Sequence, residues 1–172
     1  MKQQWIVPGI AGGLAFSVLS VVFGAVSLFT EVDRPSWLIL NNLTAVPGFI
    51  FCGVAGSAAA RATGHRSSGA AAGTLAGTIA AVVISVAPYA LAYGFIDAVR
   101  QYPFEYFDVL NSGAPSIRAF LLSDEGRATV FSTSVGLVPV VAFFSAAVGA
   151  LVGLFGGCCA RSGFRRVGWS AR

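Results

Sequence analysis

Few residues of this 172-residue chain could carry chemistry, because it holds only three cysteines and one histidine. Cys158 and Cys159 are adjacent, and together with His65 they could offer three ligands to a metal ion. Adjacent cysteines rarely bind one ion well, however, and a fourth ligand is missing. The pair also lacks the spacing of a redox motif, and Cys52 stands alone in an apolar stretch. We therefore expect no metal site and no cofactor, and we interpret the cysteines as small packing residues.

Two acidic residues offer the other possible binding chemistry. Glu105 and Asp108 are three residues apart, so on a helix they would share one face and could bind a cation weakly. A solvated acidic face is the simpler interpretation, which we adopt. Elsewhere no serine or cysteine has an evident base in the sequence, and the glycines fall in apolar stretches rather than in a phosphate-binding loop. The sequence thus predicts no catalytic residue, and we do not expect an enzyme.

The composition indicates which elements hold these residues. Hydrophobic residues make up 56% of the chain and charged residues 10%, with a mean hydropathy of +0.78. A soluble domain carries about 25% charged residues. Four stretches have no charge at all, and each exceeds the roughly 20 residues that a helix needs to cross the hydrocarbon: 3–30, 35–60, 67–96 and 128–160. They are also too long for the strands of a barrel, which have about 10 residues.

We therefore predict an all-α polytopic membrane protein with four transmembrane helices, arranged as two antiparallel hairpins. Residues 1–172 would form one domain with an outer loop at 97–127, a basic tail at 161–172 and these approximate spans: 5–29, 36–60, 68–96 and 128–160. The first stretch could instead be a secretory signal with a cleavage site near residues 25–27. A signal core has about 7–15 residues, whereas this one runs from Trp5 to Phe29, so we expect a retained helix.

The charged residues separate onto the two sides of this predicted bundle. One side carries seven of the 11 Lys and Arg residues and no acid, and the other carries all seven acids. The basic side includes Lys2, residues 61–66 and the tail at 161–172. The positive-inside rule makes this side cytoplasmic, so both termini are predicted to be cytoplasmic in a multi-pass protein of the inner or plasma membrane. The four arginines of the tail suit anionic headgroups better than nucleic acid.

The outer loop should contain short helices. Pro103 suits the first position of a helix, with Glu105 near its N-terminus. Turn-forming residues at 111–115 should end that helix, and a short apolar piece follows at 117–122. Ser123 is the expected N-cap of the last helix, which would begin outside the bilayer.

Glycines at four-residue spacing give the sharpest signal. Small faces let helices approach closely inside a bilayer, where contact rather than water exclusion drives association. We expect the third and fourth helices to pack through two such faces: Gly69, Gly73, Gly77 and Gly149, Gly153, Gly157. The same spacing of small residues recurs in the first two helices: Gly9, Gly13, Ser17 and Cys52, Gly56, Ala60. A glycine face could instead contact another subunit, or line a self-assembled pore.

Prolines inside apolar stretches should bend the helices. Three lie there, Pro47 near mid-membrane and Pro88 and Pro139 toward the outer side. Small-residue faces at the cytoplasmic side and proline kinks toward the outer side suggest a bundle whose helices pack closely at the cytoplasm and diverge toward the outside. Four polar residues belong to that outer half and could edge a pocket or lie at the membrane surface: Asn41, Asn42, Tyr89 and Tyr93. We adopt the second interpretation.

The predicted spans contain no Asp, Glu, Lys, Arg or His, which argues against proton relays and ion pathways. The leading hypothesis is a non-catalytic accessory or structural subunit of a larger membrane assembly. It would contact the bilayer and either a membrane protein partner or a second copy of itself. The candidate partner-binding residues form a stripe on the first helix and an aromatic pair in the outer loop: Gly9, Gly13, Ser17, Phe104 and Phe107.

Two other functions remain open. The first is a small-molecule or lipid-binding membrane protein with an outward-facing pocket. The second, which fits less well, is an oligomeric channel. In composition alone the chain resembles small, glycine- and alanine-rich four-span bacterial membrane proteins, and no motif narrows that resemblance.

Overall fold

A computed structural model describes residues 4–30, 45–99, 113–136 and 138–167. The protein is all-α, as predicted, with no strand among these residues. Its elements in chain order are α1 (Ile6–Phe29), α3 (Ala45–Thr63), α4 (Arg66–Gly94), α6 (Ile117–Leu122), α7 (Asp124–Phe131), a π-helical turn (Ser132–Gly136) and α8 (Val138–Val167).

Among the described residues, three segments are long and apolar enough to cross a membrane: α1, α4 and Asp124–Cys158. At 24 and 29 residues, α1 and α4 would be about 36 and 43 Å long, more than the roughly 30 Å of hydrocarbon. This is the pattern of a multi-pass membrane protein. The remaining predicted span, the second at 36–60, overlaps α3, which has 19 residues rich in Gly and Ala and is not among the three segments. Residues 36–44 lie outside the described ranges.

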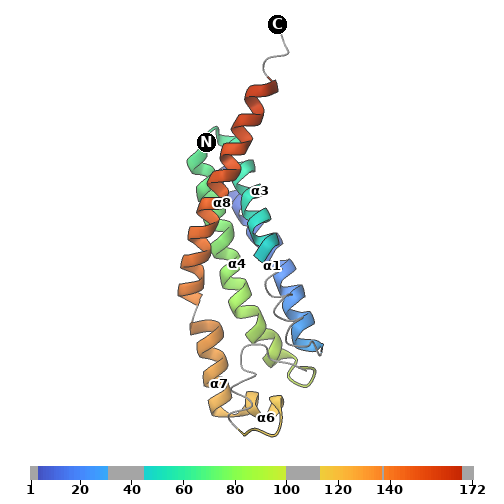
Figure 1. The fold of residues 1–172 in the computed structure, drawn as a ribbon. Helices are drawn as coiled ribbons and strands as arrows, with labels where there is room; N and C mark the ends of the chain where they lie inside the picture. The colour runs from blue at the N-terminus through green and yellow to red at the C-terminus, as the bar shows by residue number, and fades with distance from the viewer. Residues whose placement is uncertain (1–3, 31–44, 100–112, 137, 168–172) are drawn as a thin grey trace.

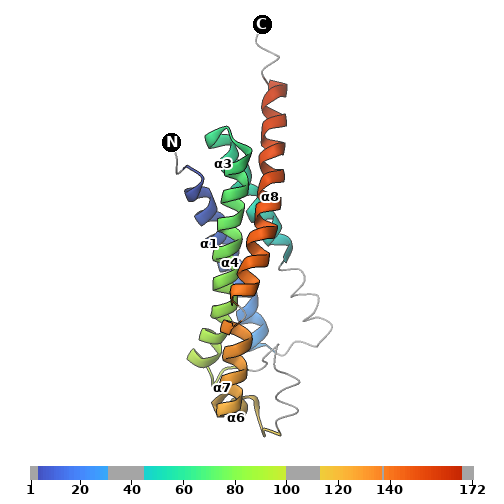
Figure 2. The same cartoon turned by 90° about the vertical axis from the view of Figure 1, so that its left-hand side faces the viewer.

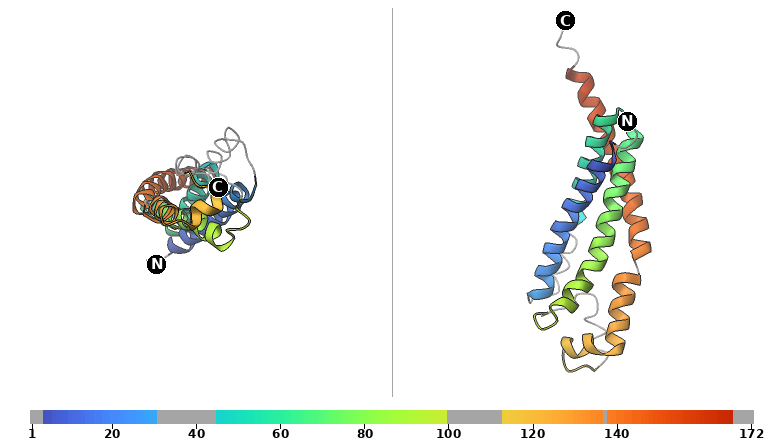
Figure 3. Two further views of the ribbon diagram at one scale, coloured as in Figure 1. Left: turned by 90° about the horizontal axis from the view of Figure 1, so that it is seen from below. Right: turned by 180° about the vertical axis from the view of Figure 1, so that it is seen from behind.

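The long helices run side by side along one axis, and each is antiparallel to the next in the chain (Figure 1). α1 begins and α8 ends at the same end of the bundle, and α3 occupies the half nearest that end (Figures 1 and 3). The central helix is α4, which contacts α1, α3 and α8. Within the chain 28% of the most apolar part of α4 is buried, against 6% for the segment that contains α8. α8 is therefore a peripheral helix with a large outward surface.

The turn between α3 and α4 is closed by Gly64. This residue has a φ of +73°, a left-handed conformation that glycine adopts without strain. Its N–H donates to the carbonyl oxygen of Ala60 at 2.8 Å, which ends α3 in the usual way. α4 then starts at Arg66, while α8 continues past the turn (Figure 2).

At the opposite end α6 and α7 fold back over the bundle. The Ser116 side chain accepts from Ala119 N–H and caps α6, and Ser123 accepts from Gly126 N–H and caps α7. The prediction of Ser123 as an N-cap is thus confirmed. The largest buried side chains belong to this end, in a cluster drawn from four helices: Leu28, Ala92, Phe120, Leu121 and Val130. The expected outward splay is therefore filled by apolar side chains of the chain itself.

The three prolines lie in different surroundings. Pro139 lies in the first turn of α8 and follows the π-helical turn Ser132–Gly136, a departure from α-helical geometry beside a residue that lacks an N–H and excludes a carbonyl one turn earlier. α4 stays helical through Pro88. The structure describes α3 from Ala45 onward, and the residues that precede it lie outside the described ranges. The predicted bend at Pro47 therefore stays a prediction.

Candidate functional site

α4 and α8 meet backbone to backbone along their glycines. A Cβ atom added at Gly73 would collide with the carbonyl oxygen of Gly149, and one at Gly149 with the carbonyl oxygen of Gly73. One turn away, a Cβ at Gly69 would lie 2.7 Å from the carbonyl oxygen of Gly153. One turn in the other direction, a Cβ at Gly77 would collide with the backbone of Ser145. The structure brings the two glycine faces together, except that Gly77 meets a serine.

α3 also packs on this contact, although its sequence alone does not indicate that it packs there. A Cβ at Gly56 would collide with the backbone of Gly153, and a Cβ at Gly156 with the carbonyl oxygen of Gly53. Gly153 thus touches both α3 and α4. The small-residue spacing in the second predicted span was a sign of such a contact, but spacing alone does not say which helix covers a face. Three helices therefore share one glycine-lined junction.

The stripe on α1 is covered by α4, which corrects its assignment to an outside partner. Gly9, Gly13 and Ser17 are all buried. A Cβ at Gly9 would lie 3.0 Å from the carbonyl oxygen of Ala72, and one at Gly13 would lie 3.0 Å from that of Ala76. The physical reason is the same as for α4 and α8. Two helix faces made of small residues can approach closely, and the close contact stabilises the pair. Phe104 and Phe107, the other candidate partner residues, lie outside the described residues.

Hydroxyl groups along the helices bond back to their own helix. Ser17 donates to the carbonyl oxygen of Gly13 at 2.7 Å, and Ser57 to that of Gly53 at 2.8 Å. Thr74 and Thr78 bond one turn back in the same way, both at 2.9 Å. Such bonds satisfy a hydroxyl locally. Among the described residues, the buried Ser20 hydroxyl is the exception, with no hydrogen-bond partner.

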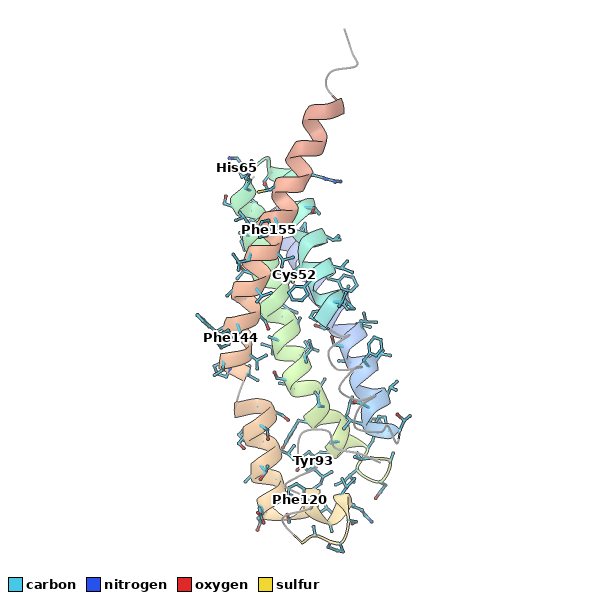
Figure 4. All side chains as sticks on the ribbon, viewed as in Figure 1. Cys52, His65, Tyr93, Phe120, Phe144 and Phe155 are labelled. Atoms are coloured by element: carbon cyan, nitrogen blue, oxygen red, sulfur yellow. The ribbon has the colours of Figure 1, made fainter. Side chains whose placement is uncertain are left out.

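Two of the four polar residues assigned to the outer half lie in the apolar cluster at that end. The rings of Tyr89 and Tyr93 are 4.8 Å apart, and Tyr89 makes an edge contact with Phe131. The Tyr93 hydroxyl donates to the carbonyl oxygen of Leu121 at 3.1 Å and so ties α4 to α6 (Figure 4). These two tyrosines are half-buried and pack against the apolar cluster, and Asn41 and Asn42 lie outside the described residues.

The remaining chemical candidates are dispersed. His65 is exposed in the turn, where its Nδ1 lies 2.7 Å from the carbonyl oxygen of Thr63. Cys52 is buried in α3 and Cys158 is half-buried in α8, and both are free thiols. Within the described residues no group of three His, Cys, Asp or Glu side chains could hold a metal ion. Glu105 and Asp108 fall outside the described ranges.

The outward face of α8 carries large apolar side chains. Phe143, Phe144 and Phe155 are 70%, 64% and 69% exposed, while the glycines on the opposite face are buried. Phe144 and Phe155 lie about three turns apart on the same helix (Figure 4). We call Phe143, Phe144 and Phe155 the α8 aromatic face. It holds three of the six phenylalanines that are exposed among the described residues.

No protein-family model, curated protein or solved structure matches this chain.

Proposed function

We propose that the protein is a non-catalytic integral membrane subunit that packs into, or beside, a larger membrane assembly. The observation that carries this proposal is the interior of the bundle, where α3, α4 and α8 touch through glycine backbones. Atoms of the chain itself fill that junction, and the neighbouring hydroxyls bond to their own helices. A bundle of this kind supports a scaffolding role better than it supports a polar pathway.

The proposal includes a fourth span and an orientation. α3 and the residues before it, 36–44, would complete the second crossing, so that the chain forms two hairpins. An even number of crossings agrees with the placement of the start of α1 and the end of α8 at one end of the bundle. The excess of Lys and Arg at that end supports a cytoplasmic position for both termini of a protein in the inner or plasma membrane.

The α8 aromatic face is the surface that we assign to the partner. α8 packs through one small-residue side and exposes the other, and it is the least buried of the three long apolar segments. Large aromatic residues serve as anchors in many protein interfaces. Lipid is the competing neighbour of any apolar surface inside a bilayer, so the assignment needs a direct test.

The test is a native gel of mild-detergent extracts from the membranes of the source cells, probed for this chain. The wild type should migrate with a complex much larger than 17.7 kDa. Replacing Phe143, Phe144 and Phe155 together by Ala should release the chain as a smaller species that is still inserted in the membrane. A matched control replaces three exposed valines of α1, at 72%, 65% and 54% exposure, by Ala and should leave the complex intact: Val7, Val18 and Val22.

A wild-type chain that runs alone at every mild detergent concentration would overturn the proposal. If that lone chain kept a tightly bound small molecule or lipid, the ligand-binding function would take its place. Equal release by the aromatic and valine variants would show that the partner does not recognise the α8 aromatic face.

A further inference from the structure

Three basic residues lie at the turn between α3 and α4. Arg61 lies in the last turn of α3, His65 in the turn and Arg66 at the start of α4, and all three are exposed. α8 passes close to this turn. A Cβ atom at Gly157 would lie 3.2 Å from the Cβ of Ala60 and 3.7 Å from the carbonyl oxygen of Arg66. The ends of α3 and α4 therefore touch α8 at this level.

The backbone of α8 adds further basic positions immediately beyond this contact. α8 stays helical from Gly157 to Val167 and carries three arginines in that stretch: Arg161, Arg165 and Arg166. Arg161 follows Gly157 by four residues, so it occupies the same face of the helix one turn further along. Arg165 continues that register by another turn. The register thus places two arginine positions above the α3–α4 turn.

Acidic residues in the described part of the chain lie at the opposite end of the bundle. They are Asp97, which follows α4, and Asp124 and Glu125, the first two residues of α7. Among the described residues, therefore, no carboxylate neutralises the cluster at the α3–α4 turn. The ion pair that joins Arg118 to Asp97 at 3.0 Å also lies at that opposite end.

The cluster also lies at the depth of lipid headgroups. α4 begins its apolar run directly after Arg66, and the uncharged stretch of the last helix ends at Ala160, directly before Arg161. If these helices cross a bilayer, the arginines follow the hydrocarbon boundary within about one helical turn. Guanidinium groups bind phosphate oxygens with two parallel hydrogen bonds, and basic sites between transmembrane helices recognise anionic headgroups.

We propose that Arg61, Arg66 and the first turn of α8 beyond Cys158, including Arg161, form a binding site for the headgroup of an anionic phospholipid. The site requires only that the helices cross a bilayer, and it does not depend on the partner assembly proposed above. Its ligand is a membrane lipid that carries a phosphate and a net negative charge, held between three helix ends.

The test measures lipid retention by the full chain, purified in mild detergent, by native mass spectrometry with phosphatidylglycerol or phosphatidylcholine at equal concentrations. The wild type should retain phosphatidylglycerol preferentially. The pair Arg61→Gln and Arg66→Gln should weaken that retention by about fivefold per arginine. The matched control, Arg118→Gln with Arg127→Gln, removes two exposed arginines at the opposite end and should leave it unchanged.

Three results would overturn the inference. The first is equal retention of the two lipids by the wild type, and the second is equal loss in the two double variants, which would reflect net charge alone. The third is displacement of phosphatidylglycerol by inorganic phosphate at a similar concentration, which would assign the site to a free anion. Should the glutamine pair fail to fold, the single change Arg161→Gln carries the same test, with a loss of about fivefold expected.

Discussion

Gly73 and Gly149 show how completely this bundle depends on the absence of side chains. Each glycine faces the carbonyl oxygen of the other, so the two helix backbones are in direct contact. Within a bilayer such contacts replace the water exclusion that holds soluble cores together. Even a methyl group is too large for this position, because it would meet rigid backbone rather than the end of a flexible side chain. The identity of a single residue thus determines the distance between α4 and α8.

Gly73→Ala should therefore destabilise the protein by about 1–3 kcal/mol, the usual cost of overpacking. Helix propensity alone would favour the alanine, so a loss of stability would isolate the contact between the helices. The measurement is reversible unfolding in mild detergent, followed by circular dichroism. Gly24→Ala is the matched control, because a Cβ there would meet nothing within 4 Å. Equal stability of the two variants would contradict the backbone contact.

At the scale of elements, Ser123 links the two short helices of the outer end. Its hydroxyl donates to the carbonyl oxygen of Phe120 at 2.6 Å and accepts from the N–H of Gly126 at 3.0 Å. It therefore ends α6 and starts α7 with one side chain. Gly126 permits the sharp turn, because a Cβ there would collide with the Phe120 carbonyl. This turn holds Phe120 and Leu121 in the apolar cluster over the ends of α1 and α4.

Ser123→Ala should lower the free energy of unfolding by about 1 kcal/mol, since it removes an N-cap. Chemical unfolding in detergent, monitored by circular dichroism, measures the change. Ser132→Ala serves as the control: its exposed hydroxyl bonds back to Thr129 at 2.9 Å, and its loss should change the stability little. A Ser123 variant as stable as the control would show that the α6–α7 turn is held by apolar contacts alone.

The helices themselves could be predicted closely from the sequence. The first span, predicted at 5–29, is Ile6–Phe29, and the third, predicted at 68–96, is Arg66–Gly94. The length of each uncharged stretch determines these bounds, because charged residues avoid the hydrocarbon. The N-cap at Ser123 can be predicted equally well, since a serine before two acidic residues is a common helix start.

The pairing of the helices could be predicted only in part. Glycine spacing pointed to the contact between α4 and α8, but the same signal on α1 was assigned to a partner, and α4 covers it instead. A helix face made of small residues carries no side chain whose chemistry would identify the helix that packs on it. Prolines raise a similar difficulty: Pro88 lies within a continuous helix, whereas Pro139 follows a π-helical turn. That turn has the sequence Ser-Thr-Ser-Val-Gly. The conformation of these residues depends on contacts with other helices, which the local sequence does not specify.

At the scale of the whole molecule, charge divides the bundle into two ends. Arg61, His65 and Arg66 lie at the end where α1 starts and α8 finishes. In the described chain the acids Asp97 and Glu125 belong to the other end, close to α6 and α7. Membrane insertion retains short basic segments in the cytoplasm. The same asymmetry that we assign to lipid binding therefore also predicts the orientation of the chain.

The orientation can be measured by labelling single cysteines in intact cells, after Cys52, Cys158 and Cys159 have been replaced by Ser. Ala98→Cys and Ser67→Cys place one thiol at each end, both at exposed positions. A membrane-impermeant maleimide should label the cysteine at 98 and not the one at 67, because the acidic end lies outside. Permeabilised cells should label both, which controls for reactivity. Labelling at 67 alone in intact cells would reverse the orientation, and the basic cluster would then face the outer leaflet.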